Sequence, residues 1–128
     1  MGTYVTDANA PELADGSNIT ATGTGSWTYV GSPGHVAFRA ETGSVTGTSV
    51  TCDVEVEIAD DSSGTNARSV GVFQRLTEAD DNVDRFLQAY VDESYARVSY
   101  TVAGTSPVIP LTVTAVQPHL LRDGDTSA

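Results

Sequence analysis

The sequence predicts an all-β fold, an antiparallel β-sandwich or jelly roll of six to seven strands with an extended N-terminal arm. Several runs alternate apolar and polar residues with a period of two, and turn residues separate these runs at short intervals. Apolar residues make up only 39% of the 128-residue chain, which favours one thin core with many turns. We expect an arm over residues 1–34, the sandwich domain over 35–118 and a flexible tail over 119–128.

The predicted arm contains few periodic apolar residues and many Gly, Ser, Thr and Asp residues. Trp27 belongs to its first apolar cluster, and we interpret this side chain as a core or edge residue rather than as a ligand-stacking one. An arm that cannot pack on itself often docks on a neighbouring subunit. The predicted partner-contact residues are therefore Tyr4, Val5 and Leu13.

The clearest strand is expected over residues 50–58, where five apolar side chains alternate with Thr51 and three acidic side chains. Cys52 lies on the apolar face and is predicted to be a buried packing residue. Shorter strands are predicted over residues 35–42, 69–76 and 84–91. Residues 77–91 also show helical spacing, but the Asp80-Asp81-Asn82 turn cluster favours a loop over 77–83.

Residues 95–116 form two alternating runs joined by a Gly-Thr-Ser-Pro segment, and this pattern predicts a β-hairpin. Pro110 cannot donate a hydrogen bond to a ladder, so the second strand is expected to begin at an edge or a bulge. Pro118 is expected to end it.

The charge composition makes several partners poor candidates. The chain has 17 carboxylates, six arginines and no lysine, which gives a net charge of -11. This field repels phosphate backbones and anionic lipids, so neither nucleic acid nor a membrane is a predicted partner. The composition favours either a halophilic origin, because molar salt screens such a surface, or a genome of high GC content. We expect no secretion signal and no spanning helix, and the single cysteine allows no intrachain disulfide.

Motifs for catalysis and metal binding are weak. His35 and His119 have no carboxylate or cysteine at ligand spacing, and no Gly-x-Ser-x-Gly or phosphate-binding loop is present. The predictions are therefore no enzyme activity, no catalytic residue, no metal and no cofactor. Two acidic turns, 60–64 and 80–84, keep Ca²⁺ as an alternative. A carbohydrate-binding module is another alternative, because aromatic rings can stack on sugars. The candidate rings are Trp27, Tyr29, Tyr90, Tyr95 and Tyr100.

The pattern Tyr95-x-Arg97-x-x-Tyr100-Thr101-x-x-Gly104-Thr105-x-Pro107, followed by an apolar strand, resembles the C-terminal signature of small virion structural proteins of tailed viruses. This group includes β-sandwich capsid decoration (cement) proteins. Upstream, the order of strand 50–58, Asp-rich turn 60–64 and Phe-containing strand 72–77 agrees loosely, so the resemblance covers about residues 46–116.

The resemblance implies a structural role without enzyme activity. It implies binding to the major capsid protein on the outside of the assembled shell, commonly as a homotrimer at or near threefold positions, and therefore localisation to the virion surface. A tail or head-tail virion component is the alternative within the same class. The resemblance does not extend to the N-terminal residues, so the partner surface is expected in the arm or in the acidic loops.

Overall fold

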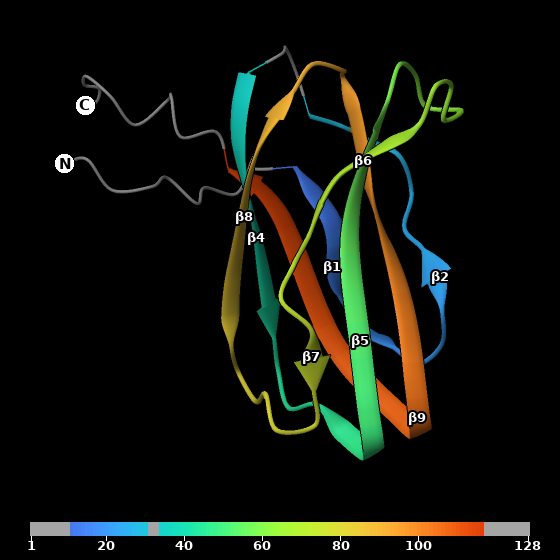
Figure 1. Cartoon of the computed structure of the whole chain (residues 1–128), viewed down its shortest axis with the longest axis vertical. Helices are drawn as coiled ribbons and strands as arrows, with labels where there is room; N and C mark the ends of the chain where they lie inside the picture. The colour runs from blue at the N-terminus through green and yellow to red at the C-terminus, as the bar shows by residue number, and fades with distance from the viewer. Residues whose placement is uncertain (1–10, 31–33, 117–128) are drawn as a thin grey trace, which may run out of the picture.

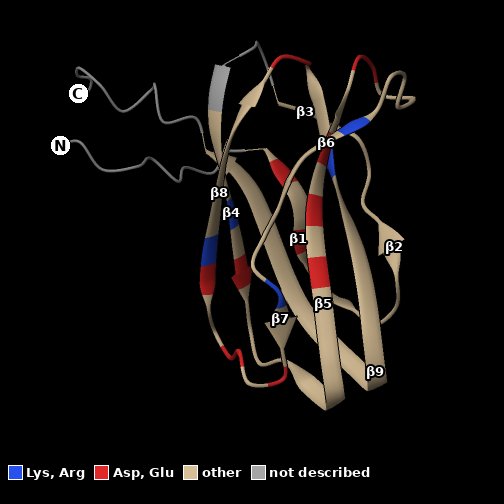
Figure 2. Ribbon diagram, in the orientation of Figure 1, with Lys and Arg blue, Asp and Glu red and all other residues tan. Residues whose placement is uncertain are grey.

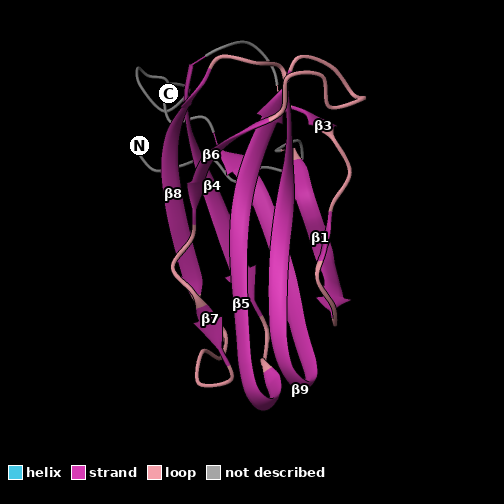
Figure 3. Ribbon diagram, turned by 45° about the vertical axis from the view of Figure 1, so that its right-hand side comes forward, coloured by secondary structure: helices cyan, strands magenta, loops and turns pink. Residues whose placement is uncertain are grey.

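The computed structural model describes residues 11–30 and 34–116, and these residues form an antiparallel β-sandwich that is nearly closed into a barrel (Figure 1). Strands and loops account for all of this part of the chain, without any helix (Figure 3). The predicted all-β antiparallel fold is thus confirmed. The strands of the described residues are β1 Glu12–Ile19, β2 Gly23–Thr24, β3 Thr28–Tyr29, β4 Gly34–Thr42, β5 Thr46–Ala59, β6 Arg68–Val72, β7 Leu76–Thr77, β8 Asp84–Val91 and β9 Tyr95–Val116.

The longest strand, β9, contributes to both sheets of the sandwich. Its first half pairs with β5 and with the short β2 and β3, while β6 and β7 pair with the other edge of β5. Its second half pairs with β1 and β4, and β8 pairs with the other edge of β4. The predicted hairpin over 95–116 is therefore wrong in its pairing, because the two halves lie in opposite sheets instead of bonding to each other.

Strands β5 and β9 bend together at one end of the sandwich, and the paired bend is visible at the bottom of Figure 1. The backbone there takes positive φ angles at Gly47 (125°), Ser49 (55°), Gly104 (115°) and Ser106 (50°). The pairing continues through the bend, with Thr48 opposite Thr105, and two register shifts absorb the change of direction. The turn residues are thus where the sequence predicts them, but they turn a pair of strands rather than a single hairpin.

The prediction of an irregular arm over 1–34 is corrected for residues 12–29, which belong to the sandwich through β1, β2 and β3. Strand β1 has no regular alternation of apolar and polar residues, because it is an edge strand with two register shifts and a Gly16 at φ 93°. Strands β2, β3 and β7 have two residues each, which explains the excess over the predicted six to seven strands. Residues 1–10 and 119–128 lie outside the described residues.

The core follows the predicted pattern in the long strands. All five apolar side chains at alternating positions of β5, from Val50 to Ile58, are buried, and Cys52 among them is fully buried. Burial raises the pKa of the Cys52 thiol to about 11. Strand β8 is confirmed over 84–91, and the loop before it over 78–83, because Thr77 pairs with β5 as the last residue of β7. The predicted strand 69–76 is divided into β6 and β7, and the intervening Phe73 is buried.

Candidate functional site

Leu13 lies on β1 and is only 4% exposed, as a member of the hydrophobic core. Its side chain is therefore occupied mainly by intramolecular packing, which corrects its placement on an arm that docks on a partner. Tyr4 and Val5 lie outside the described residues, and their predicted partner contact stays a prediction. Among the described residues, a surface that binds a partner or a ligand therefore has to include other side chains.

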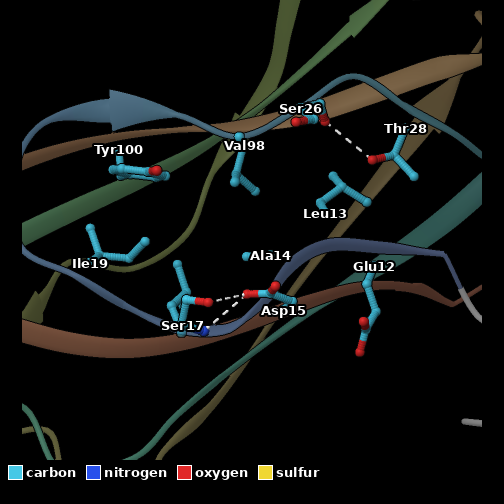
Figure 4. Close-up of a pocket in the computed structure, with 12 residues that line it drawn as sticks. Glu12, Leu13, Ala14, Asp15, Ser17, Ile19, Ser26, Thr28, Val98 and Tyr100 are labelled. Carbon is cyan, nitrogen blue, oxygen red and sulfur yellow. Dashed lines mark hydrogen bonds between the residues drawn. The ribbon is translucent and has the colours of Figure 1, made fainter.

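A groove of about 310 Å³ opens between β1 and the segment that carries β2 and β3 (Figure 4). Strand β1 pairs with the second half of β9, whereas β2 and β3 pair with the first half. Because these two halves belong to opposite sheets, β1 is not hydrogen-bonded to β2 or β3, and the groove lies between β1 and these two strands. Its apolar wall includes Leu13, Val98 and Leu111, which are buried, together with the partly buried Ile19 and Tyr100.

The rim of the groove is polar and carries negative charge. The Asp15 carboxylate accepts hydrogen bonds from the Ser17 hydroxyl (2.6 Å) and the Ser17 N–H (3.1 Å), as Figure 4 shows. These hydrogen bonds, first that of the hydroxyl, lower the pKa of Asp15, so its carboxylate is ionised at neutral pH. The hydroxyl of Thr28 donates to the Ser26 carbonyl on the opposite rim (3.1 Å). A small ligand with one apolar face and several hydroxyl groups matches this arrangement.

Trp27 lies between β2 and β3, at the edge of the sheet that contains the first half of β9, as its interpretation as a core or edge residue predicts. The Arg97 guanidinium lies 4.4 Å from the centroid of the Trp27 ring, and its Nε donates to Glu57 Oε1 at 2.8 Å. Gly64, at φ 82°, approaches the ring from the 60–67 loop so closely that a Cβ atom there would lie 2.7 Å from Trp27 Nε1. The ring is thus held by the protein itself.

The acidic turn at 60–64 is closed by its own hydrogen bonds. Asp61 accepts from the Thr65 hydroxyl (2.8 Å), the Thr65 N–H (3.3 Å) and the Ser63 N–H (2.9 Å), and these bonds lower its pKa. Asp60 accepts from the Asn66 amide at 2.7 Å. Across residues 11–30 and 34–116, no group of three or more His, Cys, Asp or Glu side chains is arranged to hold a metal ion.

The second acidic turn is organised by Asp80. Its carboxylate accepts from the Thr77 N–H (2.9 Å) and hydroxyl (3.2 Å), and it forms an ion pair with Arg85 (3.1 Å). The Thr77 N–H makes the largest contribution to lowering the pKa of Asp80. Neighbouring acidic residues connect this loop to the corner of the sandwich, because Glu78 accepts from the Val50 N–H at 2.7 Å and Asp81 from the Val45 N–H at 3.1 Å.

We expect Asp80→Asn to lower the thermal midpoint at pH 7 and to reduce its pH dependence in acid. Since the folded pKa lies below the unfolded value of about 4, the carboxylate stabilises the fold above that pH, and this contribution is lost as the pH falls through the folded pKa. The difference in melting temperature between the native protein and the variant should therefore narrow from pH 7 to pH 3. A difference of equal size at both pH values would contradict this role.

Ion pairs and charge are unevenly distributed over the surface (Figure 2). Every arginine of the described residues lies within 4.0 Å of a carboxylate, and the chain as a whole has 17 carboxylates against six arginines. The pairs are Arg39 with Glu41 and Asp84, Arg68 with Asp92 and Glu93, Arg75 with Asp53, Arg85 with Asp80, and Arg97 with Glu57.

The bend of β5 and β9 forms an uncharged tip, which we define as residues 46–49 and 103–106. All of these residues are exposed, and they are Thr, Ser, Gly and Ala residues only. Figure 2 shows this end of the two strands without a charged residue. No motif marks the tip, but the sequence contains a signal for it, since residues 43–52 and 98–116 carry no charged side chain.

None of the family models, curated proteins or solved structures compared with this chain matches it. Among residues 11–30 and 34–116, there is no helix with the length and apolar character that crossing a membrane requires.

Proposed function

We propose that this protein is a capsid decoration (cement) protein of a tailed virus, which binds the outside of the shell and stabilises it. The proposal includes a homotrimeric assembly, contact with the major capsid protein and localisation to the virion surface. The observation that carries it is the likeness of residues 95–107 to the signature of small virion proteins. Two residues of this segment also have structural roles in the fold: the Arg97 guanidinium lies over the Trp27 ring, and Gly104 takes a positive φ at the bend of β9.

We assign the uncharged tip as the surface that faces the shell. A protein with a net charge of -11 is repelled by other acidic surfaces, but its exposed Thr48 and Thr105 can approach such a surface without like charges meeting. The contact of each copy is small, and repetition over the symmetric lattice multiplies its effect.

Co-sedimentation tests the proposal. The probe is a shell assembled from the major capsid protein whose gene lies nearest to the gene for this protein. The purified protein should pellet with the shells and raise the temperature at which they rupture. Thr105→Glu should weaken binding to the shell at least tenfold, since it adds a negative charge to the uncharged tip. Ser62→Glu adds the same charge in the exposed 60–64 turn and should bind as the native protein does.

Absence of the protein from the shell pellet would contradict the decoration role. Binding of a labelled copy to tails or to the head-tail junction, seen by electron microscopy, would instead favour the alternative virion component. Equal binding by Thr105→Glu and the native protein would remove the tip from the contact and leave the decoration role in place.

Carbohydrate binding is the second candidate function, and the groove beside β1 is the observation that favours it. Tyr100 supplies part of an apolar wall, while Asp15, Ser17 and Ser26 supply carboxylate and hydroxyl groups at the rim. Retention of the protein on an insoluble polysaccharide, lost in Asp15→Asn, would favour this function over the decoration role.

A further inference from the structure

The loop between β7 and β8, residues 78–83, is hydrogen-bonded to the two residues between which half of the uncharged tip lies. Glu78 Oε1 accepts from the Val50 N–H at 2.7 Å, and Asp81 Oδ1 accepts from the Val45 N–H at 3.1 Å. Val45 and Val50 directly flank the part of the tip that belongs to β5. Figure 1 shows this loop and the bend of β5 and β9 at the same end of the sandwich. The loop therefore binds the backbone on both sides of this part of the tip.

This part of the tip, residues 46–49, has little else to keep it in one conformation. Its pairing with β9 shifts register between Thr46 and Thr48 and again between Thr48 and Thr51, so the ladder is irregular here. Its side chains are only Thr, Gly, Thr and Ser, and all of these residues are exposed. A segment with an irregular ladder and no buried side chain opens at a low free energy. The order of the tip therefore depends on what holds its ends.

The two flanking N–H groups depend on these carboxylates as acceptors. Val50 is 1% exposed and Val45 is 3% exposed, so water reaches little of either residue. A buried N–H without an acceptor is costly, and a hydrogen bond to a carboxylate is stronger than one to a neutral acceptor. If either carboxylate is removed, the free N–H favours backbone movements that expose it to water. The exposed residues between the two valines are the part of the chain that can move most easily.

Further contacts fix the loop itself on the protein. The Asn82 N–H donates to the Gly43 carbonyl at 3.0 Å, which joins the loop to the turn between β4 and β5. The Asp80 carboxylate accepts from the Thr77 N–H at 2.9 Å and pairs with Arg85 on β8 at 3.1 Å. Because the loop is attached to its neighbours at these points, the two carboxylates that bind the ends of the tip have fixed positions.

We propose that Glu78 and Asp81 are positioning residues for the tip, which hold its flanking N–H groups so that residues 46–49 keep one conformation. A contact surface that is ordered before binding loses less conformational entropy when a partner binds. The loop thereby strengthens binding by the tip through order rather than through charge. The ordering of the tip is independent of the proposed function, whereas the effect on binding rests on the proposed contact of the tip with the shell.

NMR order parameters of the backbone amides of residues 46–49 test this inference. We expect values of about 0.85 in the native protein and below about 0.6 in Glu78→Ala, which loses the acceptor of the Val50 N–H. Glu78→Gln keeps a carbonyl oxygen as acceptor and should stay close to the native values. Glu12→Ala removes the same charge from an exposed side chain that has no hydrogen bond within the described residues, and it should leave the tip ordered.

Order parameters are measured in the folded protein, so a loss of global stability does not imitate the expected change. If Glu78→Ala does not fold, Asp81→Ala makes the same test from the Val45 side of the tip. Native order parameters in the alanine variants, or an equal fall in Glu78→Gln, would overturn the positioning role.

Co-sedimentation with shells extends the test to binding. Glu78→Ala should bind shells about tenfold more weakly, whereas Glu78→Gln should bind as the native protein does, although both variants lose the same negative charge. Equal changes for the two variants would mean that the loop acts through charge, and would overturn the effect of order on binding. Order parameters that respond as expected in a protein that does not bind shells would support the positioning role and contradict the proposed function.

Discussion

Gly104→Ala should lower the thermal midpoint of the protein by roughly 10 °C or more. Gly104 has a φ of 115°, a backbone conformation that residues with a side chain adopt only under strain. A Cβ atom at this position would lie 2.8 Å from Ser49 O and from Val50 Cα, and 2.9 Å from Thr48 O. These are backbone atoms of β5 at the shared bend, so they cannot move aside without breaking the pairing of β5 with β9.

Strain and steric overlap together are expected to cost about 3 kcal/mol or more, and each kcal/mol corresponds to roughly 3–6 °C in a domain of this size. Gly43→Ala is the matched control, because a Cβ atom there would meet only the Pro110 ring at 3.4 Å, an ordinary contact distance. Thermal denaturation followed by circular dichroism compares the two variants. Equal melting temperatures for them would mean that the bend tolerates a side chain and that its geometry is not specific for glycine.

The long strands could be predicted because their periodicity is a direct consequence of burial on one face. The alternation of Val50, Val54 and Ile58 with outward acidic residues fixes both the strand and its orientation. The partner of a strand has no comparable local signal. Gly104 and Pro107 are typical of a turn whether the chain bonds to itself or bends alongside β5, so the sequence could not separate a hairpin from a paired bend.

The candidate sites were less predictable than the strands, because side chains from distant segments meet only in the fold. The sequence places Leu13 in an arm because residues 1–34 contain few periodic apolar residues, whereas pairing of β1 with β9 buries it. The support of Trp27 by Arg97 and Gly64 joins three segments separated by more than 30 residues each. Charge-free runs, by contrast, are visible in the sequence and could have identified the uncharged tip.

The other large effect is expected for Phe38→Ala, which should remove about 3–5 kcal/mol of stability and lower the thermal midpoint by roughly 10–20 °C. Phe38 is fully buried on β4, opposite Leu87 of β8 and Ala115 of β9. It therefore lies on the inner face of the sheet formed by β8, β4 and the second half of β9. Truncation removes its apolar contacts and leaves a cavity that the paired strands on both sides cannot close, because their hydrogen bonds fix the spacing of the sheet.

Phe86→Ala makes the same chemical change on the adjacent strand, where the ring is 56% exposed. The Arg39 guanidinium carbon lies 6.0 Å from the centroid of this ring, a contact worth about 1 kcal/mol or less at an exposed site. Urea denaturation at low protein concentration should therefore show a large loss of stability for Phe38→Ala and a small one for Phe86→Ala. Similar losses would mean that the outer face of β8 is as well packed as the inner face of β4.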